Sequence, residues 1–370
     1  MKFNGTVFLL LMGVIGMSEV HGRQNEVDSF PPFIIEKNGR DFDRVSIHPN
    51  SEEWLFTECS RELNPEGDCH ILRYHLNTKQ LQRYALPDGY LYSYASFSPQ
   101  GHFIVMSRIP KHDGSEEKIR QSIENAEIVM MRSDGTDFRV LPITKGRKLA
   151  PFMSKDETKI AYWRSMVLRP PGSKSRTTDF DVCEYDLKTH GDFLFAGPHH
   201  FFGGGNAQYV SEDEILLGST GPGKYAQSLG EYWKKFNGSE VYKLKRKTVD
   251  LPNPSFTEIE HARNPSVDKM GNVYLEVEPP NVGVSFLRVS PSGEIYYWQA
   301  QVNIVIRGLR QILVAPNGQY LAFIYVAEGT NYRDRKSAFG MLNTSNSQWI
   351  PVAIPALRTS TLLPVRPAAE

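Results

Sequence analysis

The chain has 370 residues, and its 42 Lys and Arg residues balance 42 Asp and Glu residues, while 40% of the residues are apolar. A chain of this length can bury a large core, so it needs neither a lattice of disulfides nor a structural metal for stability. The balanced charge provides no excess of cations for sequence-independent binding of nucleic acid, so we expect no nucleic-acid partner.

The N-terminus has the order of features of a secretory signal peptide. Lys2 supplies a positive charge, an apolar run extends from Val7 to Met17, and a polar stretch ends at the small residue Gly22. The run is shorter than the about 20 residues of a membrane-spanning helix. We therefore expect residues 1–22 to be a signal peptide, with the mature protein exported to the periplasm or an equivalent lumen and without a membrane span. The alternative is a buried N-terminal strand or helix.

Export would permit disulfides. Cys59 and Cys69 flank a polar segment and could bridge the two strands of a hairpin, or they could remain separate thiols. Cys183 is then left over, as a buried strand residue. The sequence has no Cys-x-x-Cys-His motif, so we expect this chain to bind no c-type haem of its own.

The chain then repeats a unit of about 50 residues. A short apolar pair, a turn rich in Ser, Pro, Asp, Asn and Gly, and an apolar strand recur six times. The turns open at Pro49, Pro99, Ser154, Ser211, Lys269 and Pro316. Further strands follow each turn, which makes about four strands per unit. This pattern predicts an all-β fold, a six-bladed β-propeller of four-stranded antiparallel blades, with seven blades as the alternative.

The repeats divide the mature chain into three parts. Residues 23–43 form an N-terminal arm, in which Phe30–Asn38 is expected to be a strand that closes the ring by pairing with residues 348–355; the alternative is a flexible arm. Residues 44–354 form the propeller, and residues 355–370 form a Pro-rich C-terminal tail on the surface. The one helix that we expect is short, at Glu116–Asn125.

Two turn sequences resemble those of a known family. Phe97-Ser98-Pro99-Gln100-Gly101 and Ala315-Pro316-Asn317-Gly318 are similar to turns of the TolB-like, WD40-like repeats of exported propellers. The resemblance covers residues 44–353 and implies the propeller fold. Residues 23–43 leave no room for the domain that precedes the propeller in TolB, so we do not extend the resemblance to the role of TolB.

The sequence contains no recognisable catalytic set. It lacks a Gly-x-Ser-x-Gly elbow, a His-Glu-x-x-His zinc helix and a nucleotide-binding glycine pattern, so we predict no catalytic residue and no metal site. Ser133–Asp137 is interpreted as a β-turn and not as a calcium loop. His199 and His200, before three glycines, could line a metal- or haem-facing loop, but an irregular connection between blades is the favoured interpretation.

Two long insertions are candidates for partner contact. The first spans Ser219–Ser239 and carries Tyr225, Tyr232, Trp233 and Phe236. The second is the Pro-rich, acidic segment Leu251–Pro265, with Glu258 and His261. Aromatic residues dominate protein interfaces, and prolines make a loop stiff. The alternatives are that the first insertion packs on its own propeller and that the second only bridges two blades.

These features predict a non-catalytic scaffold or regulatory subunit of an exported multi-subunit complex. The single propeller with its two insertions is similar to the β subunit of hydrazine synthase, the multihaem anammox enzyme. This resemblance implies partner subunits that carry haem c, an oxidoreductase complex, and an anammoxosome location. One alternative is a stand-alone TolB-like envelope propeller that binds a peptide or a glycan at its channel, and another is a propeller hydrolase or lyase with an active site there.

Overall fold

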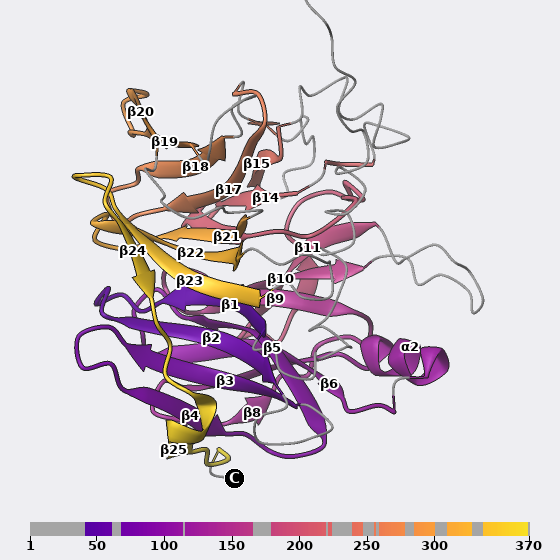
Figure 1. The fold of residues 1–370 in the computed structure, drawn as a ribbon. Helices are drawn as coiled ribbons and strands as arrows, with labels where there is room; N and C mark the ends of the chain where they lie inside the picture. Colours follow the sequence, from indigo (N-terminus) through magenta and orange to yellow (C-terminus); the bar gives the residue numbers. More distant parts are fainter. Residues whose placement is uncertain are drawn as a thin grey trace, which may run out of the picture.

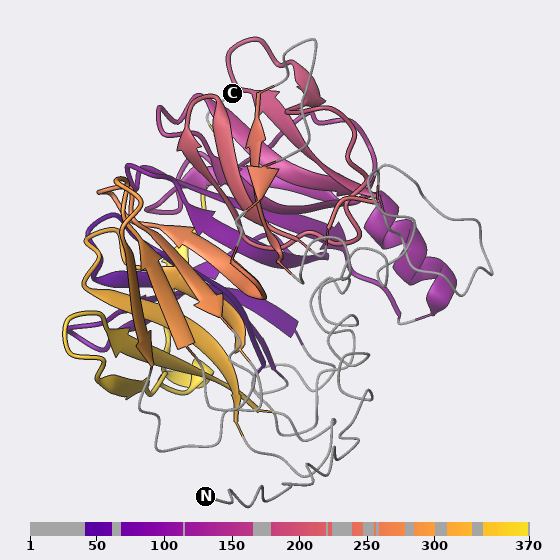
Figure 2. The ribbon, with the colours of Figure 1, turned by 90° about the horizontal axis from the view of Figure 1, so that it is seen from above.

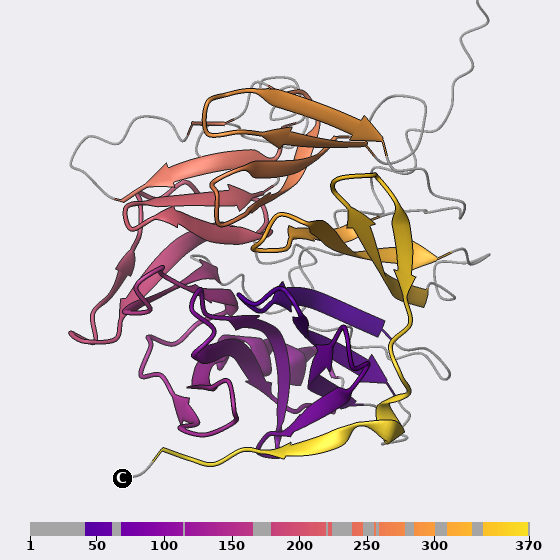
Figure 3. The same ribbon diagram turned by 90° about the vertical axis from the view of Figure 1, so that its left-hand side faces the viewer.

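A computed structural model describes residues 41–60, 68–113, 115–165, 179–219, 221–223, 239–246, 255–256, 259–277, 285–299, 309–327 and 336–368. Their strands form six sheets, and the blades follow one another around a ring in Figure 3. The fold is therefore the six-bladed propeller that the repeats predict. The expected signal peptide and the expected closing strand Phe30–Asn38 lie outside the described residues. No helix in the described ranges is long and apolar enough to cross a membrane.

Apart from one further strand in blade 1, described below, each blade is built from strands that are consecutive in the chain. Blade 1 contains β1 (Asp41–Ile47), β2 (Glu53–Ser60), β3 (Asp68–His75) and β4 (Leu81–Ala85). Blade 2 contains β5 (Tyr90–Phe97), β6 (Phe103–Pro110), β7 (Glu127–Arg132) and β8 (Arg139–Val140). Blade 3 contains β9 (Lys148–Met153), β10 (Lys159–Ser165), β11 (Phe180–Asp186) and β12 (Asp192–Leu194). Blade 4 contains β13 (Ala207–Ser211), β14 (Glu214–Gly218), β15 (Val241–Lys245) and β16 (Ser255–Phe256). Blade 5 contains β17 (Ala262–Val267), β18 (Val273–Val277), β19 (Ser285–Val289) and β20 (Ile295–Gln299). Blade 6 contains β21 (Leu309–Val314), β22 (Tyr320–Ala327), β23 (Lys336–Asn343) and β24 (Trp349–Val352). The first strand of each blade is the innermost one.

The helix that the sequence predicts is also present. It is α2 (Glu116–Glu124), which projects from the side of the ring in Figures 1 and 2. Arg120 forms ion pairs with Glu117 and Glu124 along its surface. The helix therefore adds a charged projection to blade 2 and leaves the order of the strands unchanged.

Five of the six turns after an inner strand share one hydrogen-bond pattern, in which the fourth residue donates its N–H to the carbonyl of the first. That fourth residue has a left-handed backbone, and it is glycine in three turns, Gly101, Gly271 and Gly318. In blade 1 the fourth residue is Ser51, and in blade 3 it is Glu157. Their side chains accept hydrogen bonds from the N–H groups of residues in neighbouring blades, Asn317 and Gln100 respectively, and these bonds offset the backbone strain.

Serine side chains tie the inner strands of neighbouring blades together. Ser46 Oγ accepts from Phe97 N at 3.0 Å, and the equivalent Ser266 Oγ accepts from Val314 N at 2.9 Å. In blade 2 the equivalent serine, Ser96, donates to the carbonyl of Pro151 at 2.8 Å. The N–H and C=O groups on the inner edge of a blade have no neighbouring strand at the channel. These side-chain bonds provide their hydrogen-bond partners.

The ring closes by side-chain packing between blades 6 and 1. Trp54 Nε1 donates to Tyr320 Oη at 3.0 Å, and Tyr320 donates in turn to the carbonyl of Ser51 at 2.8 Å. The rings of Phe42 and Phe56 pack on Phe339, with centroids 4.7 and 4.8 Å away. Among the described residues, blades 1 and 6 thus meet through an aromatic core.

The structure corrects our interpretation of Leu251–Pro265 as one projecting loop. Ser255 and Phe256 form the outer strand β16, and the end of the segment belongs to β17. We took the prolines as the sign of a stiff loop. Pro265, however, lies where the register of β17 shifts between Arg263 and Ser266, a bulge at which a missing N–H is tolerated.

The C-terminal tail is also more than a surface extension. After a short 3-10 helix (Leu357–Thr359), the strand β25 (Thr361–Pro364) pairs in parallel with β4 as a fifth strand of blade 1. Arg366 then bonds to blade 2, donating its N–H to the carbonyl of Gly135 and accepting from the N–H of Phe138, both at 2.9 Å. In Figure 3 this yellow segment runs along the strands of blades 1 and 2. The tail therefore links blade 6 to blades 1 and 2.

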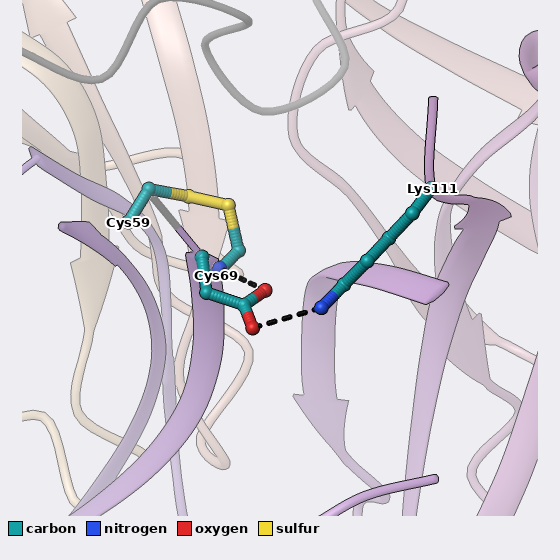
Figure 4. Close-up of a disulfide and its surroundings, with 4 residues drawn as sticks. Cys59, Cys69 and Lys111 are labelled. Carbon is teal, nitrogen blue, oxygen red and sulfur yellow. Dashed lines mark hydrogen bonds and ion pairs between the residues drawn. A yellow bond between two sulfur atoms is a disulfide. The ribbon is translucent and has the colours of Figure 1, made fainter. Parts of the chain in front are cut away.

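Cys59 and Cys69 form a disulfide between directly opposed residues of β2 and β3 (Figure 4). Beside it, Lys111 of blade 2 forms an ion pair with Asp68 at 2.9 Å, so this end of the hairpin also contacts the next blade. Cys183 is buried in β11, as we expected.

The contact of the tail with Gly135 predicts an unequal effect of two alanine substitutions. Gly135 and Gly89 have similar φ angles, 89° and 86°. A Cβ at Gly135 would clash with the carbonyl of Pro364, whereas a Cβ at Gly89 has nothing within 4 Å. Both variants should lose about 1 kcal/mol of folding free energy from the left-handed backbone. Gly135→Ala should in addition displace β25, which would lower Tm by several degrees more and open Arg358 to trypsin. Equal effects of the two changes would contradict this account of the tail.

The disulfide predicts a response to reduction. Dithiothreitol should lower the Tm of the wild type and leave that of the Cys59→Ser/Cys69→Ser double variant unchanged, because the bridge limits the freedom of the unfolded chain by about 2–4 kcal/mol. Thermal unfolding of both proteins with and without reductant measures this. A wild-type Tm that does not change on complete reduction of the disulfide would show that the bridge adds no stability.

Candidate ligand site in the central channel

The centre of the ring encloses a cavity of about 460 Å³. Its wall consists of the inner strands β1, β5, β9, β13, β17 and β21, so all six blades contribute to it. Much of the lining is apolar, including Ile47, Phe152, Val267 and Leu313. The exposed residues Gln100, Lys155 and Lys269, from the turns that follow three of the inner strands, also line it.

Three polar side chains meet across the channel. Arg44 of blade 1 donates from its guanidinium to Asn206 Oδ1, just before β13 in blade 4, at 2.7 Å. Gln311 of blade 6 also donates to Asn206 Oδ1, at 3.3 Å. In addition, Gln311 pairs with the main chain of Val45, accepting from its N–H at 2.6 Å and donating to its carbonyl at 3.2 Å. Because blades 1 and 4 lie opposite each other in a ring of six, these bonds cross the channel.

Local backbone distortion places Arg44 and its neighbour. Arg44 and Tyr94 have φ angles of 49° and 55°, and both lie at shifts of register, in β1 and β5. Ala150 repeats the conformation in β9, with φ of 47°. A bulge with a left-handed residue re-aims a side chain and costs about 1–2 kcal/mol in a residue other than glycine. The Tyr94 ring lies 4.9 Å from the Arg44 guanidinium, which is a cation–π contact.

Charge at the cavity is unbalanced. The ionisable side chains of the lining are three cations, Arg44, Lys155 and Lys269, and one carboxylate, that of Asp268. Asp268 is occupied by its own turn, because it accepts bonds from the N–H groups of Met270 and Asn272, both at 2.9 Å. The formal charge of the lining is therefore +2, although the whole chain has a net charge of zero.

Of the predicted partner-contact residues, the structure describes only His261. Tyr225, Tyr232, Trp233, Phe236 and Glu258 lie outside the described residues.

His261 is exposed, with φ of 54°, directly before β17. The sequence patterns did not single out Arg44, Asn206 and Gln311. The signal that could have found them is a polar residue within or directly before the first strand of a repeat.

The His199–His200 segment is a connection between blades, as favoured from the sequence. Its backbone N–H groups donate to Asp181, at 2.7 Å from His199 and 3.3 Å from His200. Burial raises the pKa of Asp181 to about 6, and these two N–H groups partly oppose the shift. Within the described part of the chain, no group of three His, Cys, Asp or Glu residues could hold a metal ion.

Comparison of sequences finds no relative of this chain. No family model matches it, and no curated protein matches it.

Solved structures match by fold. An oligogalacturonate lyase in complex with manganese has a TM-score of 0.50 at 12% identity, over 85% of this chain and 78% of that one. The corresponding lyase from Vibrio parahaemolyticus has a TM-score of 0.50 at 11% identity, over 87% and 79%. A puromycin-hydrolysing peptidase from Mycobacterium tuberculosis has a TM-score of 0.50 at 12% identity, over 90% and 57%. Such identities show a shared fold alone.

TolB from Acinetobacter baumannii is also among the matches. Its TM-score is 0.36 at 11% identity, over 88% of this chain and 58% of TolB. The six sheets and the three matches with a TM-score of 0.50 support the expected propeller fold, whereas the similarity to the β subunit of hydrazine synthase stays a prediction.

The raised pKa of Asp181 predicts how stability changes with pH. The folded state favours the protonated carboxyl, so the stabilisation is complete below the unfolded pKa of about 4 and is lost as the pH rises through about 6. In Asp181→Asn this loss, about 2–3 kcal/mol, should be absent. Asp186→Asn provides a control, because hydrogen bonds from the backbone of Thr189 lower the pKa of Asp186, so its contribution to stability changes only below about pH 4 and the variant should keep the wild-type profile above that. Urea unfolding between pH 4 and 7 measures both variants, and parallel profiles for the wild type and Asp181→Asn would contradict the assignment.

Proposed function

We propose that this chain is a non-catalytic binding propeller that takes its ligand into the central channel. The observation that supports this most directly is the cavity of about 460 Å³ at the centre of the ring. Its wall is largely apolar, and the polar groups of Arg44, Asn206 and Gln311 meet across the channel. A concave and largely apolar cavity with a few convergent polar groups is the usual form of a site for a small ligand.

The hydroxyl and carboxylate groups of the lining support binding over catalysis. Ser46, Ser96 and Ser266 bond to the main chain of the next blade, and Asp268 bonds to its own turn. These groups therefore have structural partners already. A nucleophile needs a neighbouring base that is itself held in place by a third group, and these serines have main-chain partners instead.

The disulfide supports export. A bridge between Cys59 and Cys69 would persist in an oxidising compartment and is uncommon in a reducing cytosol. Together with the signal-like N-terminus, it favours the exported location that we predict from the sequence.

A second candidate function, a subunit of a larger complex, is favoured by the outer strand of blade 5. In β20, Ile295 and Tyr297 are more than half exposed, at 59% and 57%, and Tyr296 is 45% exposed. Apolar side chains on an edge strand are typical of a surface that another chain covers. The finer hypothesis, a subunit of a haem c complex similar to hydrazine synthase, depends on Tyr225, Tyr232, Trp233, Phe236 and Glu258 and stays a prediction.

Blocking the channel tests the first function. Gln208 lines the cavity and is half-buried, so Gln208→Trp should fill the space with an indole ring. Val140→Trp, on the exposed outer strand β8, is the matched control. Tripeptides, tetrapeptides and oligosaccharides of two to four units should include compounds that raise the Tm of the wild type and of the control, but not that of Gln208→Trp. Stabilisation of all three proteins would place binding outside the channel, and stabilisation of none would overturn the proposal.

Purification from the native source tests the second function. If the chain is a subunit of a haem-containing complex, it should elute above its own mass with co-purifying chains and a haem absorbance. A colourless monomer would contradict that hypothesis and leave the channel proposal standing.

A further inference from the structure

We infer that the channel takes a ligand with a carboxylate on an apolar body and that Arg44 is the residue that binds the carboxylate. The inference rests on the proposed binding function and names the chemistry of its ligand. Its basis is the state of Arg44, the charge of the lining and the nature of the wall.

Arg44 carries a charge without a charged partner. Its guanidinium is half-buried, donates to the neutral amide of Asn206, and lies against the ring of Tyr94. Within the described residues no carboxylate lies within 4 Å of it, whereas Arg164 and Arg246 pair with Asp192 and Glu184. Partial removal of a cation from water is unfavourable unless an anion compensates it. The cavity therefore contains an incompletely satisfied cation.

The other charges of the lining reinforce this preference. Lys155 and Lys269 lie at the rim, where their ammonium groups donate to the carbonyls of Val210 and Pro49. The Asp268 carboxylate accepts hydrogen bonds from donors of its own turn. A cavity with an excess of one sign of charge and low-dielectric walls attracts small ions of the opposite sign. The lysines would thus draw an anion inward, and Arg44 would hold it.

The geometry favours a carboxylate with an apolar substituent. The bond to Asn206 uses one N–H of Arg44, which leaves further donors of the planar fork for a bidentate contact with two carboxylate oxygens. Arg44 is the one cation among the three polar side chains that meet across the channel, so it matches a single negative charge. Beyond it the wall is formed by side chains such as Ile47, Phe152 and Leu313, which suit an apolar body.

Arg44 is also held in place before a ligand arrives. Its left-handed backbone at the bulge, the stacked Tyr94 ring and the bond to Asn206 fix the guanidinium at the cavity. Binding would then lose little side-chain entropy, which is the general advantage of a preorganised site.

Pairs of acids and amides test the inference. The probes are 3-phenylpropionate and 3-phenylpropanamide, together with the tripeptide Ala-Ala-Phe as a free acid and as a C-terminal amide, measured by isothermal titration calorimetry. We expect at least one acid to bind the wild type about tenfold or more tightly than its amide, because a charge-assisted pair is stronger than a neutral hydrogen bond. Tight binding of the tripeptide acid alone would identify the ligand as a peptide C-terminus, and tight binding of phenylpropionate alone would identify a free organic acid.

Variants of Arg44 assign the effect to this residue. Arg44→Gln should remove the preference for acid over amide, and Arg44→Lys should restore part of it. Arg139→Gln, which removes an exposed arginine on β8, is the control and should behave like the wild type. Near-ultraviolet circular dichroism checks that each variant is folded. If Arg44→Gln is not folded, the acid preference of Arg44→Lys and the salt dependence of binding test the role of Arg44 instead.

Each remaining outcome is decisive. Equal binding of acids and amides would overturn the carboxylate inference and leave the channel function intact. Retention of the acid preference in folded Arg44→Gln would overturn the role of Arg44. No binding of any probe at millimolar concentration would overturn the carboxylate inference, and the channel proposal would then depend on the blocking experiment alone.

Discussion

The pairing of Gln311 with Val45 is the constraint on which the ring depends. A propeller must join its last inner strand to its first, and here the two strands lie 266 residues apart along the chain. The Gln311 amide meets the N–H and the carbonyl of Val45 together, in the manner of a strand neighbour. Because the same amide also donates to Asn206, ring closure and the polar crossing of the channel share one side chain. The geometry of the candidate site therefore depends on one of the contacts that close the ring.

The blades repeat their backbone more faithfully than their side chains. The turn pattern recurs in five blades and the serine tie in three, while the residue at the channel bulge changes from Arg44 to Tyr94 to Ala150. Repetition of the backbone builds a rigid ring, and variation of the side chain makes the channel asymmetric. A ligand could thus be recognised in one orientation although the scaffold is close to symmetric.

The sequence predicts what local patterns encode. Apolar strands separated by turn residues gave the six blades and their order, and β7 (Glu127–Arg132) was placed with its observed bounds. The sequence did not predict β25, because a segment of four residues that ends in Pro364 becomes a strand only when the distant β4 supplies a partner. It also did not predict the channel site, because Arg44 and Tyr94 adopt a conformation that is usually associated with glycine. Both features arise from contacts between segments that are far apart in the sequence.

The C-terminal strand has a consequence for the order in which the molecule is completed. β1 to β4 are among the first strands to be synthesised, yet their sheet gains its outer member only from Thr361–Pro364, near the end of the chain. Blade 1 thus receives its outer strand after the other blades have been synthesised, and until then β4 remains an open edge. A chain that stops before residue 361 would keep all six blades in sequence but would expose that edge to pairing with other molecules. The tail therefore covers an edge of blade 1 that would otherwise be open.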